Sequence, residues 1–224
     1  LKVHSIETLW TNEWPWIRVV IFLQWCKFKC HYCHNPDTIS EIWWSEILVD
    51  EILEIVQKEK EYFQKRWWIT FSWWEPLLQA DWLLEACKEL NKKWYNICID
   101  TNGFILTDKV KELLKYVDIV LLDIKHLDDK KHKELCWVSN KNVIVFIKYL
   151  EEIKKRFWVR HVLVPWFTND IKHINSLWMF LKKFKYMERL EILPYHRLWV
   201  YKWRLLWKEY KLENVEPPTN KEIN

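Results

Sequence analysis

Glycine is almost absent from this sequence. The 224 residues include one glycine and 19 tryptophans, whereas an average protein of this length has about 16 glycines and few tryptophans. Positive-φ turns, helix C-termini and close contacts between backbone and ligand favour a residue without a Cβ, and tryptophan suits none of them. Either this fold avoids glycine almost completely, or many of the tryptophans stand where the cell places another residue.

Long apolar runs and a strong charge of one sign are also missing. The longest apolar stretch, Ile17 to Cys26, is interrupted by Arg18 and Gln24. It is shorter than the ~18 residues that a membrane-spanning helix needs. The net charge of +4 is too small to argue for nucleic acid by itself. We therefore expect neither a membrane segment nor a nucleic-acid partner.

The N-terminus lacks the apolar region of a secretory signal. We therefore expect a cytoplasmic protein, whose six cysteines serve as ligands or buried thiols rather than as disulfides. The chain begins without Met and stops soon after Pro217 and Pro218, so we expect one or both ends to be incomplete.

Short β-rich runs alternate with amphipathic helical stretches along the chain. The pattern predicts strands at residues 17–23, 69–72, 95–100, 118–125, 157–164 and 190–194, and helices at 45–65, 78–93, 108–116, 142–155 and 171–185. Ser45 and Asp108 are the expected N-caps of two of these helices. Near-continuous Val, Ile and Leu strands indicate a parallel sheet covered by helices. The fold class predicted is α/β, a partial (β/α)6 TIM-like barrel formed by a single domain over residues 1–224.

Unusual polar residues fall at the ends of the predicted strands. They are the cysteine-rich segment 26–33, Glu75, residues 100–102, Asp123, Lys125, Arg160 and His196. Ligands bind at the carboxyl ends of parallel strands. The six strand ends therefore predict one site.

The most specific motif is a C-x3-C-x2-C triplet formed by Cys26, Cys30 and Cys33. Three thiolates can hold three irons of a cubane cluster, which ordinarily takes four cysteines. One iron is then left open, and an open coordination site is the usual mark of a catalytic metal centre. The alternatives are a zinc site completed by His31 or His34, a transient disulfide, or merely buried thiols. Zinc sites prefer paired C-x2-C units far apart in the chain, which disfavours the first alternative.

The triplet resembles the loop of radical S-adenosylmethionine (SAM) enzymes, C-x3-C-x-aromatic-C, with Tyr32 as the aromatic residue. Within that superfamily, the chain resembles the family of pyruvate formate-lyase activating enzymes over nearly its whole length. The matching segments are residues 22–24, 32–35, 72–76, 100–103, 122–125, 164–166, 193–196, 209–212 and 217–218. This resemblance implies a partial barrel of the radical SAM type.

The same resemblance implies an oxidoreductase that acts on a protein. Cys26, Cys30 and Cys33 would ligate a [4Fe-4S] cluster, and SAM would chelate the open iron through its amino and carboxylate groups. Flavodoxin or a similar low-potential donor would reduce the cluster, and the electron would cleave SAM to methionine and a 5′-deoxyadenosyl radical. That radical would abstract a Cα hydrogen from one glycine of pyruvate formate-lyase. We expect a monomer.

The resemblance also assigns residues that bind SAM. They are Tyr32, Cys33 and His34 beside the cluster and adenine, Trp74 and Glu75 at the methionine moiety, Asp123, Ile124 and Lys125 at the ribose and carboxylate, Arg160 at the carboxylate, and His196 at the adenosine. Asp100 and Thr101 match positions that hold a monovalent cation, for which oxygen ligands are suitable.

Each of these residues also has a purely structural interpretation. Tyr32 and His34 would be packing groups, Glu75 would be a charge at a helix N-terminus, Asp123 and Lys125 would lie on a solvated strand edge, and Asp100 would form an Asx turn. The three remaining cysteines, Cys87, Cys98 and Cys136, are expected to be buried small hydrophobic residues without a partner.

The resemblance further accounts for the tryptophans. The family has glycine at the positions that match Trp10, Trp14, Trp16, Trp25, Trp43, Trp44, Trp67, Trp68, Trp73, Trp74, Trp94, Trp137, Trp166, Trp178, Trp199 and Trp207. Glycine at all of them would leave 17 glycines and three tryptophans, close to an ordinary composition. The hypothesis is that UGA codons read as glycine by the source organism were translated as tryptophan. Trp73 and Trp74 would fill the SAM site, so we expect the tryptophan-containing chain to fold poorly or to bind no SAM.

Two other functions stay open. The chain could activate another glycyl-radical enzyme, such as anaerobic ribonucleotide reductase or an enzyme of the glycerol dehydratase type. Many activases of the latter type insert a cysteine-rich, ferredoxin-like module after the triplet, and the sequence has no cysteine between Cys33 and Glu75. The chain could also be a non-catalytic iron–sulfur or zinc-binding protein, which SAM cleavage would distinguish from an activase.

Overall fold

The computed structural model describes residues 1–10, 17–39, 45–59, 68–72 and 75–223. Eight strands form one sheet in the order β3-β1-β2-β4-β5-β6-β7-β8. They are β1 Lys2–Trp10, β2 Arg18–Leu23, β3 Ser45–Glu46, β4 Trp68–Ser72, β5 Asn96–Thr101, β6 Ile119–Asp123, β7 Phe157–Leu163 and β8 Met187–Pro194. From β2 to β8 all neighbours pair in parallel, whereas β1 runs antiparallel to β2 and β3. The six parallel strands confirm the predicted partial barrel.

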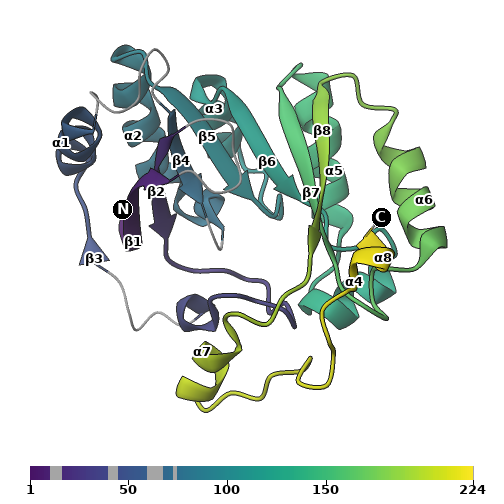
Figure 1. Cartoon of the computed structure of the whole chain (residues 1–224). Helices are drawn as coiled ribbons and strands as arrows, with labels where there is room; N and C mark the ends of the chain where they lie inside the picture. Colours follow the sequence, from purple (N-terminus) through teal and green to yellow (C-terminus); the bar gives the residue numbers. More distant parts are fainter. Residues whose placement is uncertain (11–16, 40–44, 60–67, 73–74, 224) are drawn as a thin grey trace.

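Helices follow most of the parallel strands. They are α1 Val49–Lys58, α2 Ala80–Lys92, α3 Asp108–Leu113, α4 Asp129–Cys136, α5 Lys141–Glu152, α6 Ile171–Leu181, α7 Val200–Leu205 and α8 Asn220–Ile223, with short 3-10 helices at Pro36–Ile39, Pro76–Gln79 and Leu114–Tyr116. The sheet curves into an open barrel with helices on its outer side, and α7 lies below the sheet, next to the Pro36–Ile39 helix (Figure 1).

Burial explains why the strands read as continuous apolar runs. Every residue of β2 and of β4 is buried, as expected where helices cover one face of a parallel sheet and the barrel interior covers the other. The covering helices are amphipathic. In α2, Leu83, Cys87 and Leu90 are buried, at the spacing that places them on one face.

The sequence-based prediction of two helix N-caps was wrong, although α3 begins at Asp108 as predicted. Ser45 lies in β3 and pairs with Val3 of β1. Helix α1 begins later, after Leu48. The N-cap of α3 is Thr107, whose hydroxyl accepts a hydrogen bond of 3.3 Å from the backbone N of Val110. Strands β1 and β3 and helices α4, α7 and α8 were not predicted. Two of these are very short, and the polar face of β1 hides its strand pattern.

Tryptophan occupies most of the left-handed backbone positions in the described ranges. Trp25, Trp94, Trp137, Trp166 and Trp207 have φ values of 84°, 63°, 69°, 68° and 54°. Three of them follow the C-termini of α2, α4 and α7, where glycine is the usual residue because it lacks a Cβ. All five belong to the 16 positions at which the sequence resemblance expects glycine.

The single glycine shows why a left-handed backbone position favours this residue. Gly103 has a φ of 66°, and a Cβ at this residue would lie 2.6 Å from Cδ1 of Leu122 and 3.1 Å from Cδ1 of Phe146. Both conformation and space therefore require glycine where the chain leaves β5.

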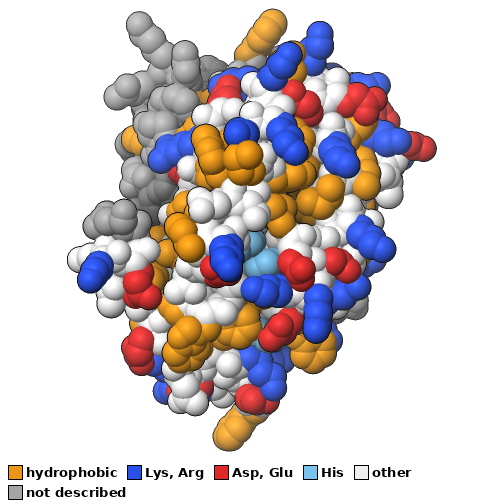
Figure 2. Space-filling view, turned by 90° about the vertical axis from the view of Figure 1, so that its right-hand side faces the viewer, with side chains coloured by type: hydrophobic (Ala, Val, Ile, Leu, Met, Phe, Trp, Pro, Cys, Tyr) orange, Lys and Arg blue, Asp and Glu red, His pale blue; other side chains and the backbone are white. Residues whose placement is uncertain are grey.

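The surface carries charges of both signs. The face on the side of α6 and the C-terminal segment shows acidic and basic side chains interspersed with hydrophobic ones (Figure 2), in keeping with the small net charge. Within the described ranges, no helix combines the length and the apolar character needed to cross a membrane.

Candidate active site at the carboxyl ends of the strands

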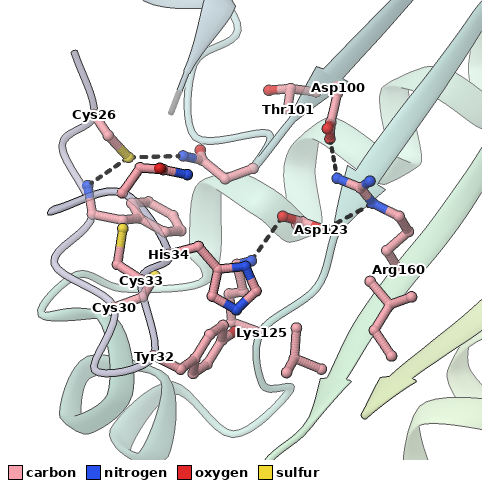
Figure 3. A pocket seen from close by; sticks show the side chains of 15 residues that line it. Cys26, Cys30, Tyr32, Cys33, His34, Asp100, Thr101, Asp123, Lys125 and Arg160 are labelled. Carbon is pink, nitrogen blue, oxygen red and sulfur yellow. Dashed lines mark hydrogen bonds and ion pairs between the residues drawn. The ribbon is translucent and has the colours of Figure 1, made fainter. Parts of the chain in front are cut away.

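One pocket lies where the parallel strands end. Its walls are formed by Cys26, Phe28, Cys30, Tyr32, Cys33, His34, Asn35, Asp100, Thr101, Asn102, Asp123, Lys125, Arg160, Val162 and Leu193. The loop after β2 supplies the cysteines on one side, and the ends of β5, β6 and β7 supply charged groups on the other (Figure 3). The topology thus brings eleven residues of the strand-end prediction into one pocket, together with His34: Cys26, Phe28, Cys30, Tyr32, Cys33, Asp100, Thr101, Asn102, Asp123, Lys125 and Arg160.

Backbone contacts hold the cysteine loop in place. The backbone N of Phe28 donates to Sγ of Cys26 over 3.3 Å, and that of Cys33 donates to the carbonyl of Cys30 over 3.1 Å. The Cys33 carbonyl accepts a 2.8 Å hydrogen bond from the indole Nε1 of Trp203 in α7. Burial raises the pKa of Cys33 to about 12 and that of Cys26 well above its usual value. A metal that binds these sulfurs must therefore displace their protons.

Four charged side chains face the cysteines across the pocket. Lys125 Nζ lies 2.7 Å from Oδ2 of Asp123, and Arg160 forms ion pairs with Asp100 and, over 3.3 Å, with Asp123. Burial lowers the pKa of Lys125, but Asp123, Tyr32 and Cys30 together outweigh burial and hold that pKa well above its usual value. The sequence analysis expected the anion beside Arg160 to be the SAM carboxylate. In this structure two carboxylates of the chain itself meet that need.

Glu75 is buried and takes the structural role that the sequence analysis weighed as an alternative. Its Oε1 accepts hydrogen bonds from the backbone N of Leu77 (3.0 Å) and from the Thr101 hydroxyl (2.6 Å), and its Oε2 accepts one from the backbone N of Asn102 (3.0 Å). Burial raises the pKa of Glu75 to about 7. The carboxylate thereby ties the start of the Pro76–Gln79 helix to the end of β5, and it does not line the pocket.

Two histidines from distant segments meet at the edge of the pocket. The rings of His34 and His196 stack with centroids 4.3 Å apart. Burial, with the neighbouring His196, lowers the pKa of His34 to about 3, so the ring is neutral at physiological pH. The Tyr32 hydroxyl and Nδ1 of His196 are buried, and neither has a hydrogen-bond partner among the residues that the structure describes. These orphaned polar atoms beside the cysteines fit a site that receives a polar ligand.

Ile124 and His196, two further expected SAM contacts, do not line the pocket. Ile124 is buried; its backbone N donates to the carbonyl of Arg160 over 3.0 Å, and its own carbonyl lies 2.6 Å from the imidazole Nδ1 of His161. Trp74 lies outside the described residues.

The structure adds Asn35, Val162 and Leu193 to the pocket, which sequence reasoning did not assign to the site. Asn102, one of the strand-end residues expected there, also lines the pocket, and its Nδ2 lies 3.7 Å from Sγ of Cys26. Cys87 and Cys98 are buried, as expected. Cys136 is buried too, but the expectation that it lacks a partner was wrong, because its Sγ lies 3.5 Å from Sγ of Cys30. No sequence signal linked these two cysteines, since only the packing of α4 against the loop brings them together.

Comparisons with known proteins place this site in a family. The profile of the radical SAM superfamily matches residues 20–177. The chain is 39% identical over 230 aligned residues to a pyruvate formate-lyase-activating enzyme of Staphylococcus epidermidis, an alignment that covers 99% of this chain and 91% of that protein. The corresponding Staphylococcus aureus protein is 38% identical with the same coverage. The chain belongs to the radical SAM superfamily and, within it, to the family of the pyruvate formate-lyase-activating enzymes.

Solved structures agree on the fold of this radical SAM enzyme. A domain of a pyruvate-formate lyase-activating enzyme from Bacteroides vulgatus superposes with a TM-score of 0.57 at 22% identity, over 69% of this chain and 86% of that one. Streptococcus suis SuiB bound to S-adenosylmethionine gives a TM-score of 0.62 at 23% identity, over 78% of this chain and 39% of that one. Membership of the superfamily implies SAM and a [4Fe-4S] cluster as cofactors.

Proposed function

We propose that this chain activates pyruvate formate-lyase by generating a glycyl radical on it. The observation that carries the proposal is the single pocket in which the three cysteines of the loop face Asp123, Lys125 and Arg160. The Staphylococcus relatives, which match nearly the whole chain, support the choice of partner. When bound, the cluster and SAM supply the chemistry, in which an electron cleaves SAM to methionine and a 5′-deoxyadenosyl radical that takes a Cα hydrogen from a glycine of the partner.

Cys26, Cys30 and Cys33 would hold the cluster. A zinc ion needs its ligands about 2.0–2.3 Å from one point. Among the side chains that the structure describes, no three from His, Cys, Asp or Glu are arranged for a metal ion in this way. Three sulfurs that line one pocket separately suit three different irons of a cubane. This donor set leaves the fourth iron without a cysteine, and that iron is where SAM would bind.

The charged groups opposite the cysteines would hold the polar parts of SAM. Lys125 and Arg160 offer N–H donors to its carboxylate, and Asp123 offers an acceptor to the ribose hydroxyls. Because Asp100 and Asp123 already balance the two cations, the pocket accepts a zwitterionic amino-acid moiety without a large change in net charge. Tyr32, His34 and His196 would flank the adenine, and position 74 and Ile124 complete the proposed contacts.

Glu75 would affect SAM binding indirectly, by positioning the backbone segments to which its carboxylate is hydrogen-bonded. Its three hydrogen bonds connect the segment after β4 to the end of β5. A monovalent cation at Asp100 and Thr101 is part of the proposal. The Asp100 carboxylate accepts a hydrogen bond from the Ser72 hydroxyl over 2.7 Å and pairs with Arg160. A cation bound there would therefore share the Asp100 oxygens with Ser72 and Arg160.

The proposed setting is a cytoplasmic monomer. A low-potential donor such as flavodoxin would supply the electron. The protein substrate would present a flexible glycine loop at the open end of the barrel, above the pocket.

The test uses the full chain in two forms, one with the 19 tryptophans and one with glycine at the 16 positions named above. Each is reconstituted anaerobically with iron and sulfide, then mixed with SAM, a reductant and pyruvate formate-lyase. A glycyl radical seen by EPR is expected from the form with glycine at the 16 positions, together with 5′-deoxyadenosine. Cys30→Ala should abolish both products, whereas Cys98→Ala, which removes a buried thiol elsewhere in the sheet, should retain them.

Two results would contradict the proposal. SAM cleavage without a radical on pyruvate formate-lyase would point to another glycyl-radical enzyme as the partner. A bound zinc ion with no SAM cleavage in either form would point to a non-catalytic metal protein.

A further inference from the structure

A fourth buried cysteine touches the cysteine loop from outside the pocket. Cys136, the last residue of α4, has no exposed surface, and its Sγ lies 3.5 Å from Sγ of Cys30. Cys30 lines the pocket and Cys136 does not. The two sulfurs therefore meet on the side of Cys30 that faces away from the proposed cluster.

Backbone hydrogen bonds fix this contact. The backbone N of Lys29 donates to the carbonyl of Cys136 over 3.1 Å, and that of His31 donates to the carbonyl of Leu135 over 3.0 Å. These two bonds join the residues on either side of Cys30 to the end of α4. The backbone of Cys136 is thus tied to the loop, and a single side-chain rotation separates that backbone from the thiol.

The direction of the hydrogen bond follows from the chemistry of an iron ligand. A cysteine ligand is a thiolate and has no proton to donate. Once Cys30 binds iron, only the Cys136 thiol can donate across the 3.5 Å contact. Hydrogen bonds to the sulfur ligands of an iron–sulfur cluster withdraw negative charge and help set its reduction potential.

We propose that Cys136 is a positioning residue whose thiol donates a hydrogen bond to the Cys30 thiolate and raises the reduction potential of the cluster. The proposal rests on the proposed function, because it requires the cluster on Cys26, Cys30 and Cys33. A higher potential lets a donor reduce the cluster more readily. It also ties the electronic state of the cluster to the packing of α4 on the loop.

The experiment measures the midpoint potential of the reconstituted full chain by anaerobic redox titration followed by EPR. It uses whichever of the two forms above takes up iron. Cys136→Val removes the donor and fills the space, and it should shift the potential to a more negative value. Cys136→Ser keeps a donor and should stay near the unsubstituted chain. Cys87→Ala, which removes a buried thiol in α2, should leave the potential unchanged.

The outcomes separate this inference from the proposed function. Equal potentials for Cys136→Val and the unsubstituted chain, at equal iron content, would overturn the inference alone. Loss of all iron from a folded Cys136→Val, as expected for Cys30→Ala, would also overturn it by making Cys136 a ligand. Failure of the unsubstituted chain to take up iron would overturn the proposed function. Where Cys136→Val does not fold, Cys136→Ala is titrated in its place, with the same negative shift expected.

Discussion

The indole Nε1 of Trp203 donates a 2.8 Å hydrogen bond to the carbonyl of Cys33, a residue 170 positions earlier in the chain. Trp203 is one of the three tryptophans that the sequence analysis retained. It is buried in α7, and α7 lies below the sheet, next to the Pro36–Ile39 helix (Figure 1). The C-terminal segment thereby holds the end of the cysteine loop.

Replacing this tryptophan should loosen the loop. Trp203→Phe keeps an aromatic ring but leaves the Cys33 carbonyl without its donor, which should cost about 1–3 kcal/mol of unfolding free energy. We also expect faster loss of iron to a chelator. Urea unfolding and iron release measure both effects. Trp82→Phe, at an exposed position on α2, is the control and should change neither.

Arg160 should be far more important for stability than a surface arginine near it. Arg160→Leu leaves the buried carboxylates of Asp100 and Asp123 without their shared cation, and breaking a buried pair costs about 3–5 kcal/mol. Arg156, just before β7, pairs with Glu188 at the surface, so Arg156→Leu should cost less than about 1 kcal/mol. Urea unfolding at pH 7.5 tests the contrast, and equal losses would contradict it.

Three buried histidines should make the fold sensitive to acid. The rings of His126 and His173 stack with centroids 3.8 Å apart, and His161 lies 5.1 Å from His173. Burial lowers the pKa of His126 and of His161 to about 4. The unfolded chain therefore binds more protons than the folded chain between pH ~6.5 and ~4, and the unfolding free energy falls as the pH is lowered through this range.

The measurable effect is the slope of the unfolding free energy against pH. From pH 7 to pH 5, each of these two histidines should contribute a loss of about 2 kcal/mol. Urea unfolding across this range measures the slope, and His161→Gln, which cannot take up the proton, should make it shallower. An unchanged slope in His161→Gln would show that His161 does not titrate on unfolding.

Replacing tryptophan with glycine at left-handed backbone positions should stabilise the chain. Trp166 and Trp207 have φ values of 68° and 54° and expose 76% and 96% of their surface, so little packing is lost with the indole. Trp166→Gly and Trp207→Gly should each raise the unfolding free energy by about 1 kcal/mol. Trp82→Gly, inside α2, should lower it by about 1 kcal/mol. Thermal unfolding of the three variants checks the opposite signs.

The mass of the protein from its native host tests the codon hypothesis directly. Glycine at the 16 named positions would lower the mass, because each position would carry a hydrogen atom in place of an indolylmethyl group. A mass that matches 19 tryptophans would rule the hypothesis out. Trp25, Trp94 and Trp137, all at positive φ, are the positions where peptide mapping is most informative.

Much of the fold could be predicted because its signals are local. The six parallel strands follow from short runs such as Arg18–Leu23 and Ile119–Asp123, which are buried on both faces and so read as continuous apolar segments. The cysteine triplet and Tyr32 lie within eight residues, so their spacing is visible in the sequence. The N-caps expected at Ser45 and Asp108 were wrong, because several neighbouring residues could cap each helix and only the packed chain selects one.

The sequence by itself determined the alternation of strands and helices, the cysteine triplet, and the excess of tryptophan residues, five of which take left-handed conformations in the described ranges. Tertiary structure alone decided the partners across the pocket. Arg160 meets Asp100, 60 residues away, and Cys30 meets Cys136, 106 residues away. Such contacts depend on how parallel strands align and how α4 packs on the loop. No local pattern encodes them, since each residue's charge or thiol is compatible with many partners until the chain is folded.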